Sequence, residues 1–407
     1  MDKEFNLAQE HDMEELHRRY LEDLHNYPNN FSFWFPKVKD CGIRVPKSVI
    51  VPVPDELLNA FSFENEGDKE KILAFIQENI IPILKDIKGL PFIKNGCFSN
   101  KFNFATCCPA DTKEETLFKS ISEIQYMSFM HDTMGNNEII IRERIPSPET
   151  MPRIYNGMPL NTEFRVFYDF NSHSALYVMN YWDKGYCRDT IASHNEEDGK
   201  AYDTRYPSLL REYQENAKRV LDAADKALKG VTGLEGIWSV DFLLDTTGEL
   251  WLIDMAIGRQ SAYWDPVKAL YCKNAGKIEI LLASAGIGTP YTQHRRDLDL
   301  QAMRLYDDPY YNLTTPTAIV AAYVRLRIGK EINVKDAQYF GIWEFIDREL
   351  PKTKENEMLV IDANQAEKRL EDETLPEEER KYFQNRWDRI TDVLFALAMD
   401  AFLNKEP

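Results

Sequence analysis

The segment from residue 237 to residue 256 constrains the fold of this 407-residue chain more than any other. Two apolar runs flank the tetrapeptide Asp245-Thr-Thr-Gly248, whose residue types favour a turn, so the segment predicts an antiparallel β-hairpin. With those four residues as the loop, Asp241 faces Leu252, and Asp254 lies one diagonal step away on the same sheet face. Diagonal neighbours lie about 7–8 Å apart at the backbone, so the two carboxylates can converge.

The two aspartates interrupt runs of hydrophobic residues, and buried like charges are costly unless a cation or hydrogen-bond donors lie between them. A Mg²⁺ ion that bridges nucleotide phosphates would compensate them, because Mg²⁺ takes one or two protein carboxylates together with phosphate oxygens. The hairpin alone leaves a second interpretation open, in which one aspartate caps a turn or pairs with an arginine such as Arg259.

Two lysines and one arginine add to this pattern. Lys94 lies in a strand-like run, and Lys101 follows it across a small polar loop. Lysine is a mobile point charge that suits phosphate oxygens. The strand Glu163-Phe-Arg165 places its Glu and Arg on one face, where an inward arginine can stabilise charge on a transferred phosphoryl group. Each pattern also fits a plainer structure, a surface lysine pair or a Glu–Arg cross-strand pair.

The remaining sequence predicts a mixed protein with more than one lobe. Apolar residues make up 43% of the chain and aromatic residues 12%, which is a globular composition. We expect strands near residues 48–53, 139–145, 163–168, 175–182, 236–244 and 249–255, and helices near 7–24, 69–88, 208–229, 278–285, 317–327, 338–350 and 377–403. The predicted domains are an N-terminal helix (1–30), a first lobe (31–135), a second lobe with the hairpin (136–274) and a helical C-terminal extension (275–407).

Charge and hydropathy restrict the partners. The formal net charge of −18 repels polyanions and argues against a nucleic-acid partner. No run of 18 apolar residues predicts a membrane span, and the charged start lacks the apolar run of a signal peptide, so we expect a cytoplasmic protein. Six irregularly spaced cysteines are typical of reduced thiols. The acid-rich run at 367–381 is interpreted as solvated helix faces around a turn at Pro376.

Read in order, the lysine loop, the strand at 139–145, the Glu-Phe-Arg strand and the carboxylate hairpin resemble an ATP-grasp domain. They resemble in particular the clade marked by one arginine and two lysines, which includes the eukaryotic D123 family of assembly factors for a translation-initiation complex. The segments Phe31-Ser-Phe-Trp-Phe-Pro-Lys37 and Pro46-Lys-Ser-Val-Ile-Val-Pro-Val-Pro54 are similar to the N-terminal part of that family. The likeness extends to about residue 258.

The resemblance implies an α+β or α/β ATP-grasp fold, in which two sheet-containing lobes clasp the nucleotide, with a helical C-terminal extension. It implies ATP and Mg²⁺ as cofactors. The implied nucleotide-binding residues are Lys94, Lys101 and Glu163, with Ile141, Arg142 and Glu143 on the strand that holds adenine by its backbone. Arg165 would be the catalytic residue at the γ-phosphate, and Asp241 and Asp254 the metal ligands. ATP-grasp proteins usually carry Asn two residues after the second acid, where this chain has Ala256.

Two functions fit these expectations. Our first hypothesis is an ADP-forming ligase that joins small-molecule or peptide carboxylates to amines through an acylphosphate, because most ATP-grasp domains are ligases. The alternative is a D123-like assembly factor that binds ATP without ligase turnover and takes a locally basic protein partner, since its own surface is acidic. Ala256 and the likeness to the D123 family favour this alternative.

Overall fold

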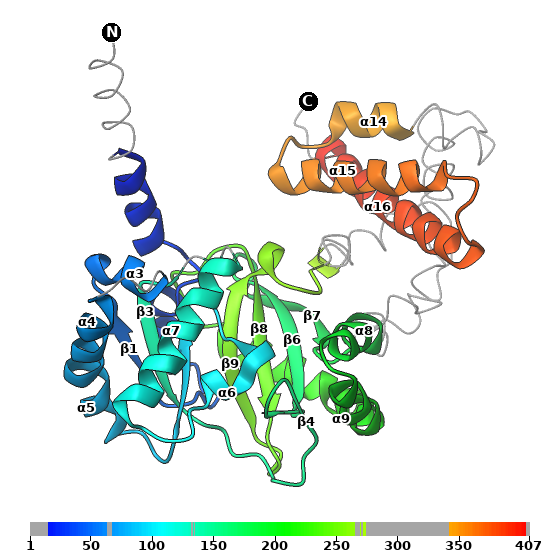
Figure 1. Ribbon diagram of the computed structural model, residues 1–407. Coiled ribbons are helices and arrows are strands. Elements are labelled where there is room, and N and C mark those ends of the chain that lie inside the picture. Colours follow the sequence, from blue (N-terminus) through cyan, green and yellow to red (C-terminus); the bar gives the residue numbers. More distant parts are fainter. Residues whose placement is uncertain are drawn as a thin grey trace, which may run out of the picture. The chain divides into compact units, whose positions relative to one another are not determined.

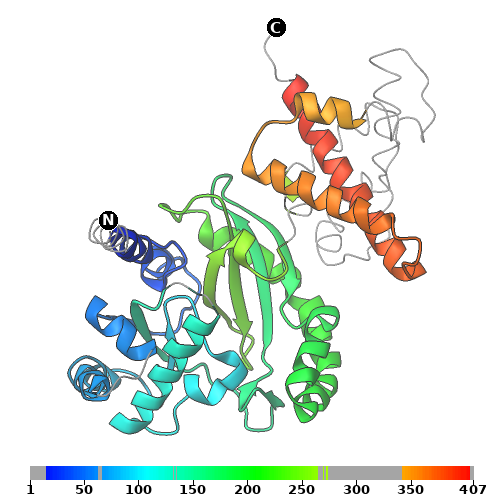
Figure 2. The ribbon, with the colours of Figure 1, turned by 45° about the horizontal axis from the view of Figure 1, so that its top comes forward.

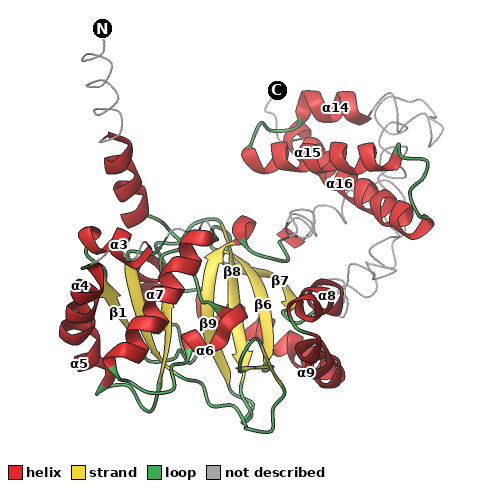
Figure 3. Cartoon of the chain, viewed as in Figure 1, coloured by secondary structure: helices red, strands yellow, loops and turns green. Residues whose placement is uncertain are grey.

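The computed structural model describes residues 15–62, 67–131, 133, 135–264, 269, 272–273 and 342–403. The chain divides into two compact units (Figure 1). The first comprises Met1–Ala175 and Met179–Ser261, and the second comprises Leu176–Val178 and Ala262–Pro407. The first unit carries two main β-sheets, whose strands are yellow in Figure 3, and the second carries the helices α14, α15 and α16.

The first sheet contains three antiparallel strands in the order β1-β3-β2: β1 is Ser48–Pro52, β2 is Pro91–Asn95 and β3 is Glu138–Glu143. The helices α3 (Asp55–Ser62), α4 (Asp68–Phe75) and α7 (Glu114–Met130) pack their apolar residues on this sheet. Because β3 lies between β1 and β2, it shares a sheet with two strands of the predicted first lobe, although the predicted boundary after residue 135 places it in the second.

The predicted helix at 69–88 is interrupted before its proline. The helix α4 passes into a π-helical segment at Ile76–Ile80, and α5 follows at Ile81–Leu84. Pro82 has no N–H group to donate, and its ring crowds the preceding turn, so the helix changes its hydrogen-bonding pattern there. The N-terminal helix is described from residue 15 and ends at residue 25. The aromatic segment forms a further short helix, α2, at Phe31–Val38.

The second sheet contains four strands in the order β7-β6-β8-β9: β6 is Thr162–Asp169, β7 is Ser174–Asn180, β8 is Ile237–Leu244 and β9 is Leu250–Ile257. The helices α8 (Lys184–His194) and α9 (Glu196–Leu228), green in Figures 1 and 2, lie side by side next to this sheet. The helix α9 is longer than the predicted 208–229 and continues through Pro207. A short hairpin of β4 (Arg153–Ile154) and β5 (Met158–Pro159) precedes β6.

The predicted carboxylate hairpin is present as β8 and β9, but its register differs. The loop has five residues, because Leu244 pairs with Leu250 rather than facing Glu249. The carboxylate of Asp245 accepts hydrogen bonds from the N–H groups of Thr247 (2.8 Å) and Glu249 (2.9 Å), and Gly248 adopts a φ of 82°. This side-chain-organised turn holds one more residue than the tetrapeptide pattern predicts.

The described part of the second unit is helical. The helix α14 is Ile342–Glu349, α15 is Lys354–Leu370 and α16 is Glu377–Leu403. The predicted helix at 377–403 matches α16, which Pro376 directly precedes. Of the helix predicted at 338–350, the described part matches α14, and residues 338–341 lie outside the described residues. The helices predicted at 278–285 and 317–327 lie outside the described residues. Among the helices of the described ranges, none is long and apolar enough to cross a membrane.

Candidate functional site

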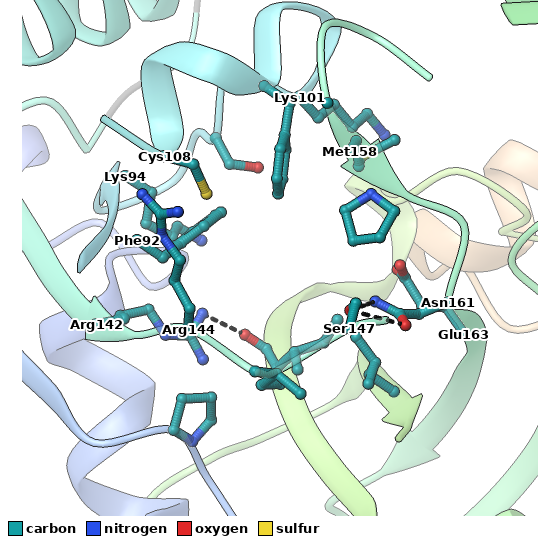
Figure 4. Close-up of a pocket in the computed structure, with 18 of the residues that line it drawn as sticks. Phe92, Lys94, Lys101, Cys108, Arg142, Arg144, Ser147, Met158, Asn161 and Glu163 are labelled. Atoms are coloured by element: carbon teal, nitrogen blue, oxygen red, sulfur yellow. Dashed lines mark hydrogen bonds between the residues drawn. The ribbon is translucent and has the colours of Figure 1, made fainter. Parts of the chain in front are cut away.

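A cavity of about 540 Å³ in the first unit is lined by residues from both sheets (Figure 4). Its size is that of a small-molecule site. Seven of the nine residues predicted for the site line it: Lys94, Lys101, Arg142, Glu143, Glu163, Asp241 and Asp254. Arg165 does not line the cavity but binds one of these residues directly. The structure does not bring Ile141 there, because its side chain is fully buried in the core of the first lobe.

Asp241 and Asp254 lie directly opposite each other on β8 and β9, and not one diagonal step apart as the sequence predicted. The pairing runs from Phe242 with Leu252 to Asp241 with Asp254, so Ile253 forms a β-bulge that shifts the register by one residue. The Nη1 group of Arg142 donates to the carbonyl of Ile253 at 2.8 Å. An arginine from the first sheet thus binds the bulged residue that brings the acids together.

Each aspartate is held by a cation. The guanidinium of Arg165, its cross-strand neighbour on β6, donates from Nε to Oδ1 of Asp241 at 2.8 Å and from Nη2 to Oδ2 at 2.7 Å. The ammonium of Lys94 donates to both carboxylate oxygens of Asp254 at 3.0 Å, and its side chain is only 2% exposed. Since buried charges are costly unless they are paired, the two acids and two cations form a balanced set.

The pKa values of the site follow from burial and from these charges. Burial opposes the positive charge of Arg165, but the carboxylate of Asp241 outweighs it and holds the pKa of Arg165 above its usual range. Burial, followed by the charge of Asp241, raises the pKa of Glu163 to about 8. Burial lowers the pKa of Arg142 to about 10, and Asp254 opposes this shift. Glu163 is therefore largely protonated near neutral pH, which removes one negative charge from the cavity.

Lys101 begins a short 3-10 helix at Lys101–Asn103, and its Nζ donates to the hydroxyl of Tyr181 at 2.9 Å. The interaction with Tyr181 is the largest cause of a raised pKa of Lys101, and burial opposes it. Tyr181 also lines the cavity, and the sequence analysis did not include it. Its contact with Lys101 spans 80 residues, and no local pattern around Tyr181 indicates it.

The strand predicted to hold a base by its backbone is the central strand of its sheet. Ile141 pairs with Val49 on one side and with Ile93 on the other, so its backbone groups are used within the ladder. The chain leaves the sheet after Glu143, and residues 144–147 line the cavity. Figure 4 shows Ser147 in this loop, hydrogen-bonded to the amide of Asn161.

The acidic side chains of the cavity offer few ligands for a metal ion. Within the described residues, no group of three or more His, Cys, Asp and Glu side chains could hold a metal. Asp241 and Asp254 supply two carboxylates, and Ala256, which pairs with Ser239, adds no side-chain oxygen. Two carboxylates suit a Mg²⁺ ion whose other ligands are phosphate oxygens and water. The residues fit a metal that enters together with phosphates.

The chain is similar to known proteins only at the level of solved structures. No protein-family model and no curated protein sequence matches the chain. The structure of C-terminally truncated Cdc123 from Schizosaccharomyces pombe is 14% identical with a TM-score of 0.38, over 57% of this chain and 85% of that one. A RimK domain ATP-grasp protein from Sphaerobacter thermophilus is 12% identical with a TM-score of 0.24, over 56% of this chain and 57% of that one. D-alanyl-alanine synthetase A from Vibrio cholerae is 11% identical with a TM-score of 0.23, over 57% of this chain and 56% of that one.

The chain has a mixed helix and antiparallel-sheet fold with a helical C-terminal region, as the sequence predicted. It spans little more than half the length of the RimK domain protein and of the synthetase. No role for any residue follows from likenesses of this size.

Proposed function

We propose that the chain binds ATP together with Mg²⁺ in this cavity. The observation that carries the proposal is the convergence of cations and carboxylates from two sheets and from the 3-10 helix at Lys101–Asn103, in a chain whose net charge is −18. The cations are Lys94, Lys101, Arg142 and Arg165. A chain this acidic has no general attraction for anions, so a local group of cations indicates a specific anionic ligand.

The ion pairs explain why metal and nucleotide would bind together. A phosphate that takes Lys94 and Arg165 must separate them from Asp254 and Asp241, which leaves two carboxylates beside a polyanion. Such like charges are costly unless a cation is present. A Mg²⁺ ion would restore the balance at the two carboxylates. The ligand best suited to the cavity is thus the magnesium complex of the nucleotide.

The lining of the cavity offers groups that suit both the base and the phosphates of ATP. Its apolar lining includes Phe92, Phe104, Leu243 and Ile253, and residues 144–147 lie along the same cavity. An aromatic base fits such a lining, with the loop backbone as its hydrogen-bonding edge. The nitrogen Nε of Arg142 is buried and has no hydrogen-bond partner among the described residues. It is a donor that a phosphate or ribose oxygen can satisfy.

The chemistry that this arrangement supports best is phosphoryl transfer to a carboxylate. Bound magnesium would neutralise charge on the phosphates. Lys94 and Lys101 would hold the phosphates, and Arg165 would stabilise the charge that develops on the transferring group. The carboxylate oxygen of the acceptor attacks the γ-phosphorus, the bond to the β-phosphate oxygen breaks, and ADP leaves. An amine then displaces phosphate from the acylphosphate. The function proposed first is therefore an ADP-forming carboxylate–amine ligase.

A second function is supported by two features of the same site. Ala256 contributes no third metal ligand, and Arg165 is engaged by Asp241 through two hydrogen bonds. Both features favour binding without turnover. In this alternative the bound nucleotide stabilises a surface for a locally basic protein partner, and ATP is not consumed.

Calorimetric titration of the whole chain with ATP, in Mg²⁺ and in EDTA, tests the shared step. Binding that requires Mg²⁺ supports the proposal, and the absence of heat at millimolar ATP in Mg²⁺ contradicts it. A screen of carboxylates paired with amines, read out as ADP release, then separates the two functions. Acceptor-dependent ADP release supports the ligase. A protein complex that forms only with nucleotide, without turnover, supports the assembly factor.

A further inference from the structure

Tyr181, directly after β7, contacts two of the predicted phosphate-binding cations. Its hydroxyl accepts a hydrogen bond from Nζ of Lys101, which lies 5.3 Å from the centre of its ring. The Cζ atom of Arg165 lies 5.0 Å from the same centre. A cation within about 6 Å of an aromatic ring is attracted by the ring's quadrupole. One tyrosine therefore interacts with both Lys101 and Arg165.

The position of Tyr181 is fixed by its surroundings. Its backbone N–H donates to the carbonyl of Glu163 at 3.2 Å, and its own carbonyl accepts from the thiol of Cys187 at 3.5 Å. The next residue, Trp182, packs edge-on against the ring with 5.2 Å between ring centres, and its indole N–H donates to the carbonyl of Asn161 at 2.9 Å. The ring is therefore placed by the second sheet and its core.

The two cations need such support because they are alike in charge. The charge of Arg165 disfavours the charged form of Lys101, as does burial. Arg165 has Asp241 as a partner and Lys94 has Asp254, but Lys101 forms no salt bridge with any described residue. Its stabilising contact is the phenol of Tyr181.

A second aromatic ring shows what is particular to Tyr181. The ring of Phe31 lies 5.9 Å from Nζ of Lys94 and 5.5 Å from Cζ of Arg142. Phe31 carries no hydroxyl, and Lys94 already has a carboxylate partner. Both lysine–arginine pairs thus face an aromatic ring, but only at Lys101 does that ring also supply the hydrogen-bond acceptor.

We infer that Tyr181 is a positioning residue for the terminal phosphate of bound nucleotide. It holds Lys101, which lines the cavity, close to Arg165 while no anion is bound, so the spacing of the two cations is set before ATP arrives. Because the two side chains are already ordered, binding of the nucleotide loses less conformational entropy. The inference rests on the proposed function, and it predicts that the pair distinguishes a triphosphate from a diphosphate.

The test compares ATP and ADP binding, in excess Mg²⁺, to the full chain and to two variants. Tyr181→Phe keeps the ring and removes the hydroxyl, so ATP affinity should fall about tenfold, equal to about 1.4 kcal/mol. Affinity for ADP should fall by less than about threefold, because ADP lacks the phosphate that the pair serves. Tyr181→Leu removes the ring as well, and the affinity for ATP should fall by a further factor of about ten. Tyr126→Phe, at a tyrosine on α7 that is 45% exposed, is the matched control.

The outcomes separate the inference from the proposed function. Equal losses for ATP and ADP would indicate a general structural role and overturn the inference, as would unchanged affinities in Tyr181→Phe. A wild-type chain that binds neither nucleotide overturns the proposed function and the inference with it. Should Tyr181→Leu fail to fold, Tyr181→Phe still decides, since circular dichroism can show that its fold is intact.

Discussion

Replacing Asp254 by asparagine should weaken the fold of the first unit and change how ATP and Mg²⁺ depend on each other. The ammonium of Lys94 is 2% exposed and donates to both oxygens of Asp254 at 3.0 Å. Asparagine keeps one acceptor oxygen but carries no charge. Hydrogen bonds to charged groups contribute about 1.5–3 kcal/mol, so we expect the free energy of unfolding to fall by about 2 kcal/mol. Urea titration followed by tryptophan fluorescence measures this loss.

The effect on binding should have opposite signs with and without metal. Without metal, the variant has one negative charge fewer beside the phosphates and a Lys94 that is easier to displace. Affinity for ATP in EDTA should therefore rise about tenfold, or about 1.4 kcal/mol. In excess Mg²⁺ the affinity should fall about tenfold, because one of two carboxylate ligands is lost. The factor by which Mg²⁺ enhances binding should then shrink about a hundredfold.

Calorimetry in the two buffers measures both constants. Asp222→Asn is the matched control, because this aspartate on α9 is 65% exposed and its partner Lys218 lies 3.7 Å away. It should leave both constants unchanged. A variant Asp254→Asn that keeps the wild-type enhancement by Mg²⁺ would refute the assignment of Asp254 as a metal ligand.

Three further substitutions test the site and its support. Glu163, whose pKa burial raises to about 8, keeps a proton in the folded chain that it loses in the unfolded chain. The free energy of unfolding should therefore fall as the pH rises from about 4.5 to about 8, by at most about 1.4 kcal/mol per pH unit. Urea titrations across this pH range should show a weaker fall for Glu163→Gln. Arg165→Ala should cost about 3 kcal/mol by leaving Asp241, 9% exposed, unpaired. Adding Asp241→Asn should restore much of that loss in the same titration, and an unrestored double variant would contradict the pairing. In Gly96→Ala the new Cβ would meet a carboxylate oxygen at 2.6 Å and a backbone oxygen at 2.7 Å, so thermal unfolding should show a loss of about 2 kcal/mol. Gly230→Ala, with nothing within 4 Å of its Cβ, should not show that loss.

The extended strands were predictable because their signals are local. Alternating or continuous apolar runs bounded by turn residues placed β1, β3, β6, β8 and β9 within a few residues of their observed bounds. The same holds for α16, whose predicted span matches its bounds, Glu377–Leu403. Helix α9 begins at Glu196, before its predicted start, and continues through Pro207.

The candidate site was predictable in its residue types but not in its contacts. Charged residues that interrupt apolar strands pointed to Lys94, Arg165, Asp241 and Asp254, because burying a charge requires a partner or a ligand. No local sequence pattern indicated which cation pairs with which carboxylate. Lys94 and Asp254 are 160 residues apart, and Arg165 and Asp241 are 76 apart.

The sequence by itself determined the hairpin, the charged strand positions and the mixed fold class, since each depends on patterns a few residues long. The tertiary structure alone decided the rest. A single bulged residue, Ile253, turned a diagonal pair of aspartates into a direct one. The strand β3 joined the first sheet through partners 44 to 94 residues away in the sequence, from Asn95 with Ile139 to Ser48 with Arg142. Tyr181 reached Lys101 only when the chain was folded. Register and long-range pairing depend on how whole elements pack together, and no local pattern specifies them.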